Sequence, residues 1–259
     1  MADDRFSLDG RVAIVTGSGT GIGRATARVL AERGADVVLA ARRVELLERT
    51  AGEVEAAGRR AIVVPTDVTD AAQCEELVAT AVGELGRLDV LVNNAGGSIN
   101  KPPEEWTVSE WHQIVDLNLA SVWFLARPAA QHMLEQGKGS IVNISSGASF
   151  LALPNVAPYG AAKAGMNSLT RSLAAAWSPQ GVRVNAVACG AVRTEGYGES
   201  TKQQDLPDGA ILGPGNAMNR VGEPDEIGHA VLFFASDASS YCTGQTLWVN
   251  GGPKAPAVT

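Results

Sequence analysis

Short apolar segments alternate with longer amphipathic segments along almost the whole chain. The apolar segments are rich in β-branched residues and predict strands buried on both faces, at 11–16, 36–41, 61–66, 88–93, 140–145, 182–188 and 245–250. The segments between them have a helical period and predict helices, at about 22–33, 44–57, 70–85, 107–136, 157–178 and 224–236. This alternation predicts an α/β protein with a doubly wound parallel sheet and helices on both of its faces.

The length and composition favour one large domain. The chain has 259 residues, of which 45 % are hydrophobic and 19 % are charged, and this suits a substantial core. No linker, repeat or low-complexity tract interrupts the alternation, so residues 1–259 are predicted to form a single domain. The longest stretch without a clear period is 194–222, which we interpret as a substrate loop because long loops in compact domains are usually functional.

Charge and cysteine usage exclude several classes of partner. The net charge is −7 and the pI is about 5.1, so no basic stripe exists for a nucleic acid. The three cysteines are single and form no ligand cluster with the three histidines, so no metal is expected. No apolar run approaches the roughly 20 residues of a membrane span, and the segment MADDRFSLDG at 1–10 is not typical of a secretory signal. We therefore predict a cytoplasmic protein that does not enter a membrane.

A glycine-rich loop follows the first predicted strand. Residues 16–23 read TGSGTGIG and lead directly into a predicted helix. Glycines at 17, 21 and 23 let the backbone turn tightly, and the helix N-terminus behind them offers free N–H groups to a diphosphate. An ordinary glycine turn is the alternative, but the position between a buried strand and a helix favours dinucleotide binding.

The segment YGAAK at 159–163 carries candidate chemistry. In a helix, residues four apart lie on one face, so the Tyr159 phenol and the Lys163 ammonium are expected to approach each other. A cation about 4 Å away contributes about 4 kcal/mol at an effective dielectric near 20, which would lower the pKa of the tyrosine from its usual value near 10. A surface ion pair without function is the alternative reading of this pentapeptide.

These motifs together resemble the short-chain dehydrogenase/reductase family. The resemblance rests on TGSGTGIG, on NNAG at 93–96, on Ser146 thirteen residues before Tyr159, and on YGAAK, and it extends to the C-terminal WVNGG. The general pattern is most similar to β-ketoacyl carrier-protein reductases and alcohol dehydrogenases. The resemblance implies a single-domain Rossmann-type fold with seven parallel strands, NAD or NADP as cofactor, and hydride transfer at a carbonyl or secondary alcohol.

The resemblance also implies catalytic roles. Tyr159 would be the general acid or base, Lys163 would lower its pKa and hold the nicotinamide ribose, and Ser146 would bind the substrate oxygen. Ser145 is the neighbouring alternative to Ser146. Asn118 would support a water that leads to the lysine, although a polar residue in an apolar helix can also simply cap or kink it.

Cofactor contacts are implied in the same way. The residues concerned are Gly17, Ser18, Thr20, Gly21, Ile22, Gly23, Asp67, Val68, Asn94, Ala95, Gly96, Tyr159, Lys163, Val192 and Thr194. Asp67 and Val68 would touch the adenine, although the same segment also reads as a helix N-cap region with Thr69 or Asp70 as the cap. The family usually has Pro-Gly after the sixth strand, whereas this chain has Cys189-Gly190, which predicts a looser loop before Thr194.

The end of the second strand bears on the choice of cofactor. An acidic residue there would bind the ribose 2′-hydroxyl of NAD, but this chain has Ala41 followed by Arg42 and Arg43. An arginine can bind a 2′-phosphate through two parallel N–H bonds, so NADP is favoured over NAD. Thr20 points the other way, because many NADP-dependent relatives carry a cation at that position.

The substrate is predicted to be a small ketone or secondary alcohol. Residues expected to line its pocket are Gly97, Ser98, Ala148, Leu153, Val156 and the loop at 195–220. The main alternative is a β-ketoacyl carrier-protein reductase; segments 135–138 and 178–180, expected at the site mouth, supply too few cations to steer an acidic carrier. A dinucleotide-binding sensor or scaffold without catalysis is the alternative of another class.

Surplus apolar residues predict a homotetramer. Helices 107–136 and 157–178 carry more apolar residues than one core face needs, and such faces usually meet a symmetric partner. The residues are Trp111, Ile114, Val115, Val122, Trp123, Phe124, Met166, Leu169, Leu173 and Trp177.

Overall fold

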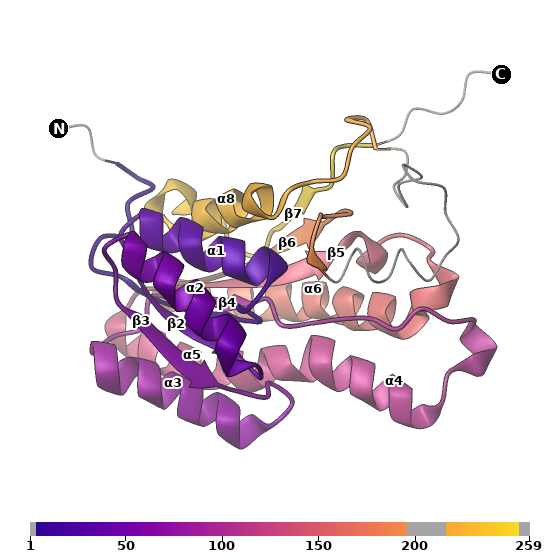
Figure 1. Cartoon of the computed structure of the whole chain (residues 1–259), viewed down its shortest axis with the longest axis horizontal. Coiled ribbons are helices and arrows are strands. Elements are labelled where there is room, and N and C mark those ends of the chain that lie inside the picture. The colour runs from indigo at the N-terminus through magenta and orange to yellow at the C-terminus, as the bar shows by residue number, and fades with distance from the viewer. Residues whose placement is uncertain (1–3, 196–215, 254–259) are drawn as a thin grey trace.

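One parallel sheet organises the protein (Figure 1). In the computed structural model, which describes residues 4–195 and 216–253, seven strands lie in the order β3-β2-β1-β4-β5-β6-β7. The strands are β1 (Val12–Thr16), β2 (Asp36–Ala41), β3 (Ala61–Pro65), β4 (Val90–Asn93), β5 (Gly139–Ser146), β6 (Val182–Cys189) and β7 (Thr246–Val249). The described α-helices are α1 (Gly21–Glu32), α2 (Val44–Ala56), α3 (Ala71–Leu85), α4 (Val108–Val115), α5 (Ser121–Gln136), α6 (Ala157–Trp177) and α8 (Pro224–Ala235). The predicted Rossmann-type architecture is confirmed.

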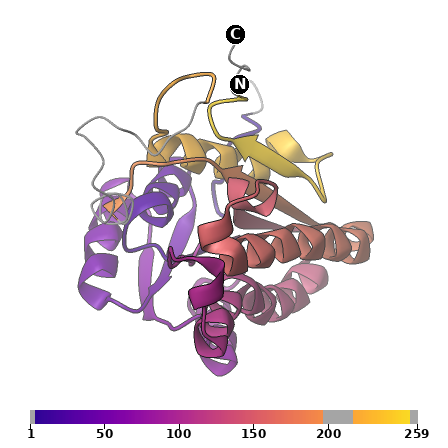
Figure 2. The same cartoon turned by 90° about the vertical axis from the view of Figure 1, so that its right-hand side faces the viewer.

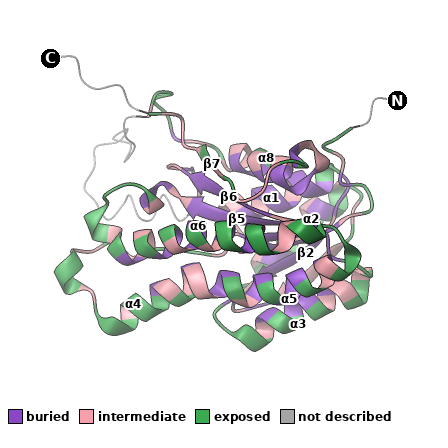
Figure 3. Cartoon of the chain, turned by 180° about the vertical axis from the view of Figure 1, so that it is seen from behind, coloured by how far each residue is buried: buried purple, intermediate pink, exposed green. Residues whose placement is uncertain are grey.

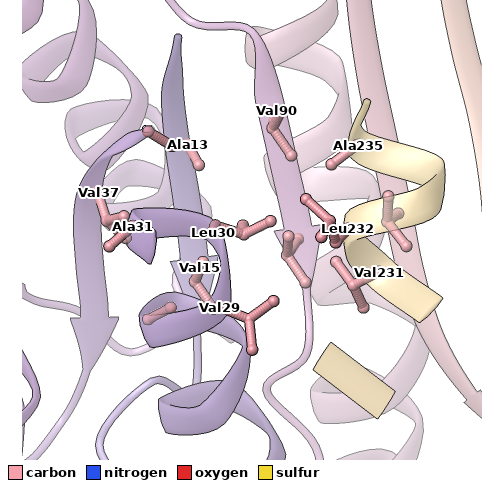
Figure 4. Packing of buried hydrophobic residues seen from close by; sticks show 14 of the residues in the cluster. Ala13, Val15, Val29, Leu30, Ala31, Val37, Val90, Val231, Leu232 and Ala235 are labelled. Carbon is pink, nitrogen blue, oxygen red and sulfur yellow. The ribbon is translucent and has the colours of Figure 1, made fainter. Parts of the chain in front are cut away.

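The helices form a layer on each face of the sheet (Figures 1 and 2). On one face, α1 and α8 pack together against β1 and β4 through a buried cluster that includes Val29, Leu30, Val231 and Leu232 (Figure 4). On the other face, α3 and α5 pack on the sheet through a second cluster. Figure 3 shows that exposed residues on α3, α5 and α6 turn away from the sheet, as amphipathic helices require. Burial of both faces explains the continuous apolar runs in the five inner strands, whereas the edge strands β3 and β7 are less buried than the sequence predicted.

The long helix predicted over 107–136 is divided into three parts. Helix α4 begins at a capping box in which Thr107 and Glu110 bind each other's backbone N–H. A π-helical segment, Asp116–Ala120, separates α4 from α5, and it contains the buried Asn118. Such π-turns widen a helix locally and are frequent at functional sites. The hydrophobic period alone did not show this interruption, because the apolar pattern continues through it.

The carboxyl ends of the strands place the predicted site at one edge of the sheet. The glycine loop follows β1, Asn94 follows β4, and Ser146 ends β5. The strand order reverses between β1 and β4, which is where open α/β sheets bind ligands. Part of the predicted substrate loop, residues 196–215, lies outside the described residues. No helix in the described part of the chain is long and apolar enough to cross a membrane.

Candidate active site

The glycine loop lies at the N-terminus of α1 and closely approaches the segment after β6. Gly21 begins the helix with a φ of +53°, a conformation that favours glycine. A Cβ atom on Gly21 would lie only 2.9 Å from the Cγ2 atom of Thr194. Helix α1 has no acidic residue in its first turn, and its N-cap residue Thr20 makes no side-chain cap hydrogen bond. The helix therefore leaves N–H groups for an external anion.

A carboxylate from another part of the chain reaches this helix end. The backbone N–H of Gly21 donates to Oε2 of Glu195 at 3.1 Å, so the carboxylate stands in for a phosphate oxygen. In the same loop, the Ser18 hydroxyl is buried and has no hydrogen-bond partner among the described residues. A backbone N–H that already binds an anion and an unpaired buried hydroxyl fit the diphosphate of a dinucleotide.

The residues after β4 hold the glycine loop in place. The side-chain amide of Asn94 donates to the backbone oxygens of Thr16 at 2.8 Å and Gly17 at 3.3 Å. The Thr16 hydroxyl accepts from the backbone N–H groups of Asn94 and Ala95, both at 3.0 Å. The side chain of Asn94 was expected to line the adenosine site, and in the structure it is used to position the loop. Gly96 lies beside Lys163 instead, because a Cβ on Gly96 would be 3.5 Å from the Nζ atom of that lysine.

The structure brings Ser146 and Tyr159 together. Ser146 ends β5, Tyr159 lies in the first turn of α6, and the two hydroxyls are hydrogen-bonded to each other. Ser145, the alternative, is buried, and its hydroxyl has no partner among the described residues. Burial raises the pKa of Tyr159 to about 12, although the hydrogen bond from Ser146 opposes the rise. The phenol therefore keeps its proton at neutral pH.

Lys163 lies one helical turn after Tyr159 and is buried, with 3 % of its surface exposed. Its Nζ atom donates to the backbone oxygen of Ile144 at 2.8 Å and lies 5.6 Å from the centre of the Tyr159 ring. Burial lowers the pKa of Lys163 to about 8. The expected lowering of the Tyr159 pKa is therefore wrong for this structure: desolvation of the phenol outweighs a cation that is itself desolvated and directed at a carbonyl.

Asn118 connects the π-helical segment to the strand end that carries Gly96. Its amide nitrogen donates to the backbone oxygens of Gly97 at 2.8 Å and Ile114 at 2.9 Å. Its Oδ1 atom accepts from the N–H of Gly97 at 3.2 Å, and a Cβ on Gly96 would lie 2.7 Å from the same oxygen. Asn118 therefore makes one hydrogen bond within its own helical segment, to Ile114, and two to Gly97. These bonds bring it close to Gly96, which lies beside Lys163.

The residues expected around the adenosine are divided between the surface and the core. Arg42 and Arg43 are exposed at the N-terminus of α2, and neither guanidinium has a hydrogen bond or ion pair among the described residues. Asp67 accepts from the N–H and hydroxyl of Thr69, and these bonds lower its pKa, with a smaller effect from the charge of Arg42. Asp70 is the N-cap of α3. Val68 is buried in the second core cluster, so its side chain is not open to an adenine.

The segment after β6 starts from a strand end that is hydrogen-bonded to β7. Cys189 is the last residue of β6, is buried, and pairs in register with Ser146 and Val249. The N–H of Gly190 donates to the Val249 oxygen at 3.0 Å, so the strand pairing continues past the position where the family has proline. The sheet therefore holds the start of this segment at Gly190; a looser loop before Thr194 stays a prediction. Val192 is buried and forms a bridge with Gly222.

Two segments expected at the mouth lie at the opposite edge of the sheet. Lys138 and Ser178 precede β5 and β6, so they lie at the amino ends of these strands, where Lys138 pairs with Asp237. Their expected position was wrong. A residue before a strand and a residue after it are separated by the length of that strand, and the predicted site lies at the other end.

Several residues near the site were missed by sequence reasoning. Glu195 directly follows Thr194, and a carboxylate beside a phosphate loop was a detectable signal. Phe150 and Trp248 stack with ring centres 4.6 Å apart, but they come from distant segments and no sequence pattern links them. No group of three His, Cys, Asp or Glu side chains that could hold a metal occurs within residues 4–195 and 216–253.

Comparisons with known proteins agree on one family. A family model described as enoyl-(acyl carrier protein) reductase matches residues 17–254. Cis-4-hydroxycyclohexanecarboxylate dehydrogenase of Sinomonas cyclohexanicum is 41 % identical over 93 % of this chain and 96 % of its own. Gluconate 5-dehydrogenase of Gluconobacter oxydans is 37 % identical over 96 % of each chain. The structure of 7α-hydroxysteroid dehydrogenase complexed with NADH and 7-oxo glycochenodeoxycholic acid has a TM-score of 0.91 at 32 % identity, with 98 % of each chain covered.

The parallel sheet, the glycine loop and the grouped serine, tyrosine and lysine define a dinucleotide-dependent oxidoreductase. The chain belongs to the short-chain dehydrogenase/reductase family. It is an NAD(P)-dependent enzyme that acts on CH–OH or C=O groups. The relatives are dehydrogenases and reductases, which favours catalysis over the alternative of a sensor or scaffold.

Proposed function

We propose that Ser146, Tyr159 and Lys163 catalyse proton transfer to or from the oxygen of a small ketone or secondary alcohol. The observation that carries this proposal is the hydrogen bond between Ser146 and Tyr159 beside a buried lysine. When bound, the nicotinamide supplies the hydride in reduction and accepts it in oxidation. The glycine loop, including Ser18 and the N–H groups at the start of α1, would hold the diphosphate of this cofactor.

Each side chain has a distinct task. The Tyr159 phenol, whose pKa is about 12, is protonated at neutral pH and can donate to a ketone oxygen. The Ser146 hydroxyl donates a second hydrogen bond to that oxygen and stabilises the charge that develops on it. In the reverse direction a phenolate must form, and the ammonium of Lys163 stabilises it. Lys163 also offers its remaining N–H groups to the ribose hydroxyls of the cofactor.

Asn118 is proposed to position the catalytic region. Its amide holds the backbone at Gly97 next to Lys163. Its Oδ1 atom has a second lone pair, which is available to a water that leads to Lys163. This arrangement supports a proton path from Tyr159 through Lys163 to solvent.

NADP is proposed as the preferred cofactor. Arg42 and Arg43 lie at the N-terminus of α2, where the helix dipole disfavours cations. Their position therefore does not stabilise the helix, whereas a 2′-phosphate would offer them a charge-assisted partner.

A free small substrate is proposed in preference to a carrier-bound one. Three of the described cations near the mouth of the site are paired with acids: Lys101 with Glu110, Arg193 with Glu223, and Arg220 with Glu226. These pairs leave little net positive charge to attract an acidic carrier protein.

A homotetramer is proposed from the exposed aromatic residues of α4 and α5. Trp111 and Trp123 are each 43 % exposed, and Val108 is 75 % exposed. The expectation was too broad, because four of the residues named for this surface are buried in the core: Ile114, Val122, Met166 and Leu173. Light scattering at micromolar concentration measures the assembly, and a monomer mass would contradict it.

Tyr159→Phe tests the catalytic proposal. Loss of the proton donor should lower kcat by about 1,000-fold, while the Kd for NADPH stays within about twofold because the ring is kept. Single-turnover oxidation of bound NADPH by cyclohexanone measures the first quantity, and fluorescence titration measures the second. Tyr241→Phe, an exposed tyrosine, is the matched control. If Tyr159→Phe keeps more than a few per cent of kcat, the assigned role is wrong.

A further inference from the structure

An exposed apolar surface lies directly beside Ser146. The segment 147–156, which joins β5 to α6, contains no charged residue. Within it, Phe150, Leu151 and Leu153 are 53 %, 57 % and 46 % exposed, and Trp248 of β7 is 38 % exposed. We call these four side chains the apolar shelf. Exposed apolar surface of this kind commonly marks a binding site.

The shelf is continuous with the reacting groups. A Cβ atom on Gly147, the residue after Ser146, would lie 3.6 Å from Cδ1 of Leu151 and 3.8 Å from Cζ3 of Trp248. Both side chains therefore pack against the backbone next to Ser146. In the strand register Trp248 pairs with Ala188 and Ala188 pairs with Ser145, so Trp248 lies one position from the level of Ser146, on the face of the sheet that Ser145 shares.

Hydrogen bonds hold the shelf rigidly relative to Ser146. The Ser149 hydroxyl donates to the backbone oxygen of Ser146 at 2.5 Å, and the side-chain amide of Asn167 donates to the Ser149 hydroxyl at 2.9 Å. The N–H groups of Phe150 and Leu151 both donate to the Gly147 oxygen at 3.0 Å. The turn thus uses its own polar groups, and few of them remain for the hydroxyls of a substrate.

We propose that the apolar shelf binds the carbon skeleton of an alicyclic ketone or secondary alcohol whose oxygen reaches Ser146 and Tyr159. This inference rests on the proposed function. The tilted rings of Phe150 and Trp248 offer a broad surface, which a compact saturated ring covers better than a thin chain. A polyhydroxylated acid would lose hydration there without gaining hydrogen bonds. The substrate class is therefore set by the segment between the catalytic serine and tyrosine together with β7.

The test compares three ketones in several variants. 2-Decalone extends from the reacting carbon onto the shelf, butan-2-one is too small to reach it, and 5-keto-D-gluconate is polar. The wild type should prefer 2-decalone over 5-keto-D-gluconate by at least about tenfold in kcat/KM. Leu151→Asn and Trp248→Ala should each lower kcat/KM for 2-decalone by about tenfold or more, with butan-2-one changed by less than about twofold.

Leu247→Ala is the matched control. Leu247 is 39 % exposed on the same strand, and its side chain points to the opposite face of the sheet from Trp248. It should leave all three ketones unaffected. A wild-type preference for 5-keto-D-gluconate, or equal losses for 2-decalone and butan-2-one in the shelf variants, would overturn the proposal. A change in particle mass with unchanged selectivity would also overturn it, since the shelf would then be a contact between two copies of the chain.

A binding measurement separates this inference from the proposed function. 2-Decalone is titrated against Tyr159→Phe with NADPH present, and tryptophan fluorescence is followed. Quenching that disappears in the double variant with Trp248→Leu supports the shelf even if the wild type turns over none of the ketones. Absence of quenching overturns the shelf, even if butan-2-one is reduced.

Discussion

The two edges of the sheet differ in how their charged side chains are paired. At the amino edge, cations and carboxylates pair with one another around a cavity of about 710 Å³. Arg11 and Lys138 lie 2.7 Å and 3.1 Å from the carboxylate of Asp237, and Arg87 lies 2.7 Å from Asp89. Most charge at this edge is therefore compensated by ion pairs; Arg183 differs, because its guanidinium donates to backbone oxygens and to the Ser239 hydroxyl.

At the carboxyl edge, several groups at the proposed cofactor and catalytic site lack such compensation, whereas Lys101, Arg193 and Arg220 are paired with acids. Lys163 is buried against a backbone carbonyl, and Arg42 has no hydrogen bond or ion pair among the described residues. Glu195 meets a backbone N–H, and the buried hydroxyls of Ser18 and Ser145 have no partner in the described part of the chain.

We interpret the paired charged groups as structural and the unpaired groups as groups that are available to a ligand. Paired groups contribute modestly to stability and have little capacity left for a ligand. Unpaired buried groups cost stability, and a bound cofactor or substrate can recover that cost. The pKa of Lys163 at about 8 is the clearest sign of the cost, since burial alone disfavours its charged form. Four substitutions test the comparison.

Lys163→Met should have the largest effect and should act in two directions. We expect kcat/KM to fall at least about 100-fold, because the cation that holds the cofactor and supports the phenolate is gone. The cofactor-free protein should become more stable by about 1–2 kcal/mol at pH 7, because a buried charge is replaced by an apolar chain. Denaturant unfolding and steady-state kinetics measure the two changes. Lys138→Met, at the amino edge, is the matched control and should lower stability slightly without loss of activity.

The gain in stability should depend on pH. The pKa of Lys163 is about 8 in the folded chain and 10.5 ordinarily, so between these values the unfolded chain binds more protons. The free energy of unfolding of the wild type therefore rises with pH from about 8 to 10.5, and the advantage of Lys163→Met should shrink over that window. A constant difference between the two proteins across this range would contradict a buried, desolvated ammonium.

Arg42→Ala should have the next largest effect. Loss of a charge-assisted bond to the 2′-phosphate should reduce the NADPH/NADH ratio of kcat/KM by about tenfold or more. Arg49→Ala, which removes an exposed arginine from the same helix, should leave the ratio unchanged. A wild type that prefers NADH, or a ratio unaffected by Arg42→Ala, would refute NADP as the preferred cofactor.

Glu195→Gln should have a smaller effect. We expect it to strengthen cofactor binding and to lower the stability of the cofactor-free protein. The carboxylate occupies a backbone N–H that a diphosphate would use, so its removal should tighten cofactor binding by about two- to fivefold, from about 0.3–1 kcal/mol for an anion at a helix N-terminus. The cofactor-free Tm should fall slightly, because α1 loses an anionic partner. Calorimetric titration and thermal unfolding measure both changes, with Glu84→Gln as a control for net charge. Weaker cofactor binding would show that Glu195 assists the ligand.

Asp237→Asn should have the smallest effect. It removes the carboxylate shared by Arg11 and Lys138 at the amino edge, and such partly exposed pairs contribute about 1 kcal/mol. The pKa of Asp237 is lowered, since the Lys138 and Arg11 partners outweigh the opposing effect of burial. The loss should therefore be present at neutral pH and vanish as pH falls through the folded pKa. Any large change in kcat/KM would break the distinction between the two edges.

Much of the fold follows from local patterns. The seven apolar runs became seven strands, and the five inner strands are buried between the helix layers, where polar side chains would be costly. The edge strands β3 and β7 are only partly buried. The glycine loop and the spacing between Tyr159 and Lys163 predicted candidate cofactor-binding and catalytic residues without any long-range information. The sequence pattern failed at Lys138, where the edge of the sheet had to be inferred from chain direction, and at Asn118, where a π-turn interrupts an unbroken apolar period.

The sequence by itself determined the succession of strands and helices along the chain, the position of the glycine loop and the residue types available for proton transfer, because these depend on neighbours in the chain. Only the tertiary structure decided the electrostatics. The pKa values of Tyr159 and Lys163 depend on burial by distant segments, and the contact of Glu195 with Gly21 depends on how β6 meets α1. The meeting of Phe150 with Trp248 is decided in the same way, because desolvation and long-range packing arise only when the chain has folded.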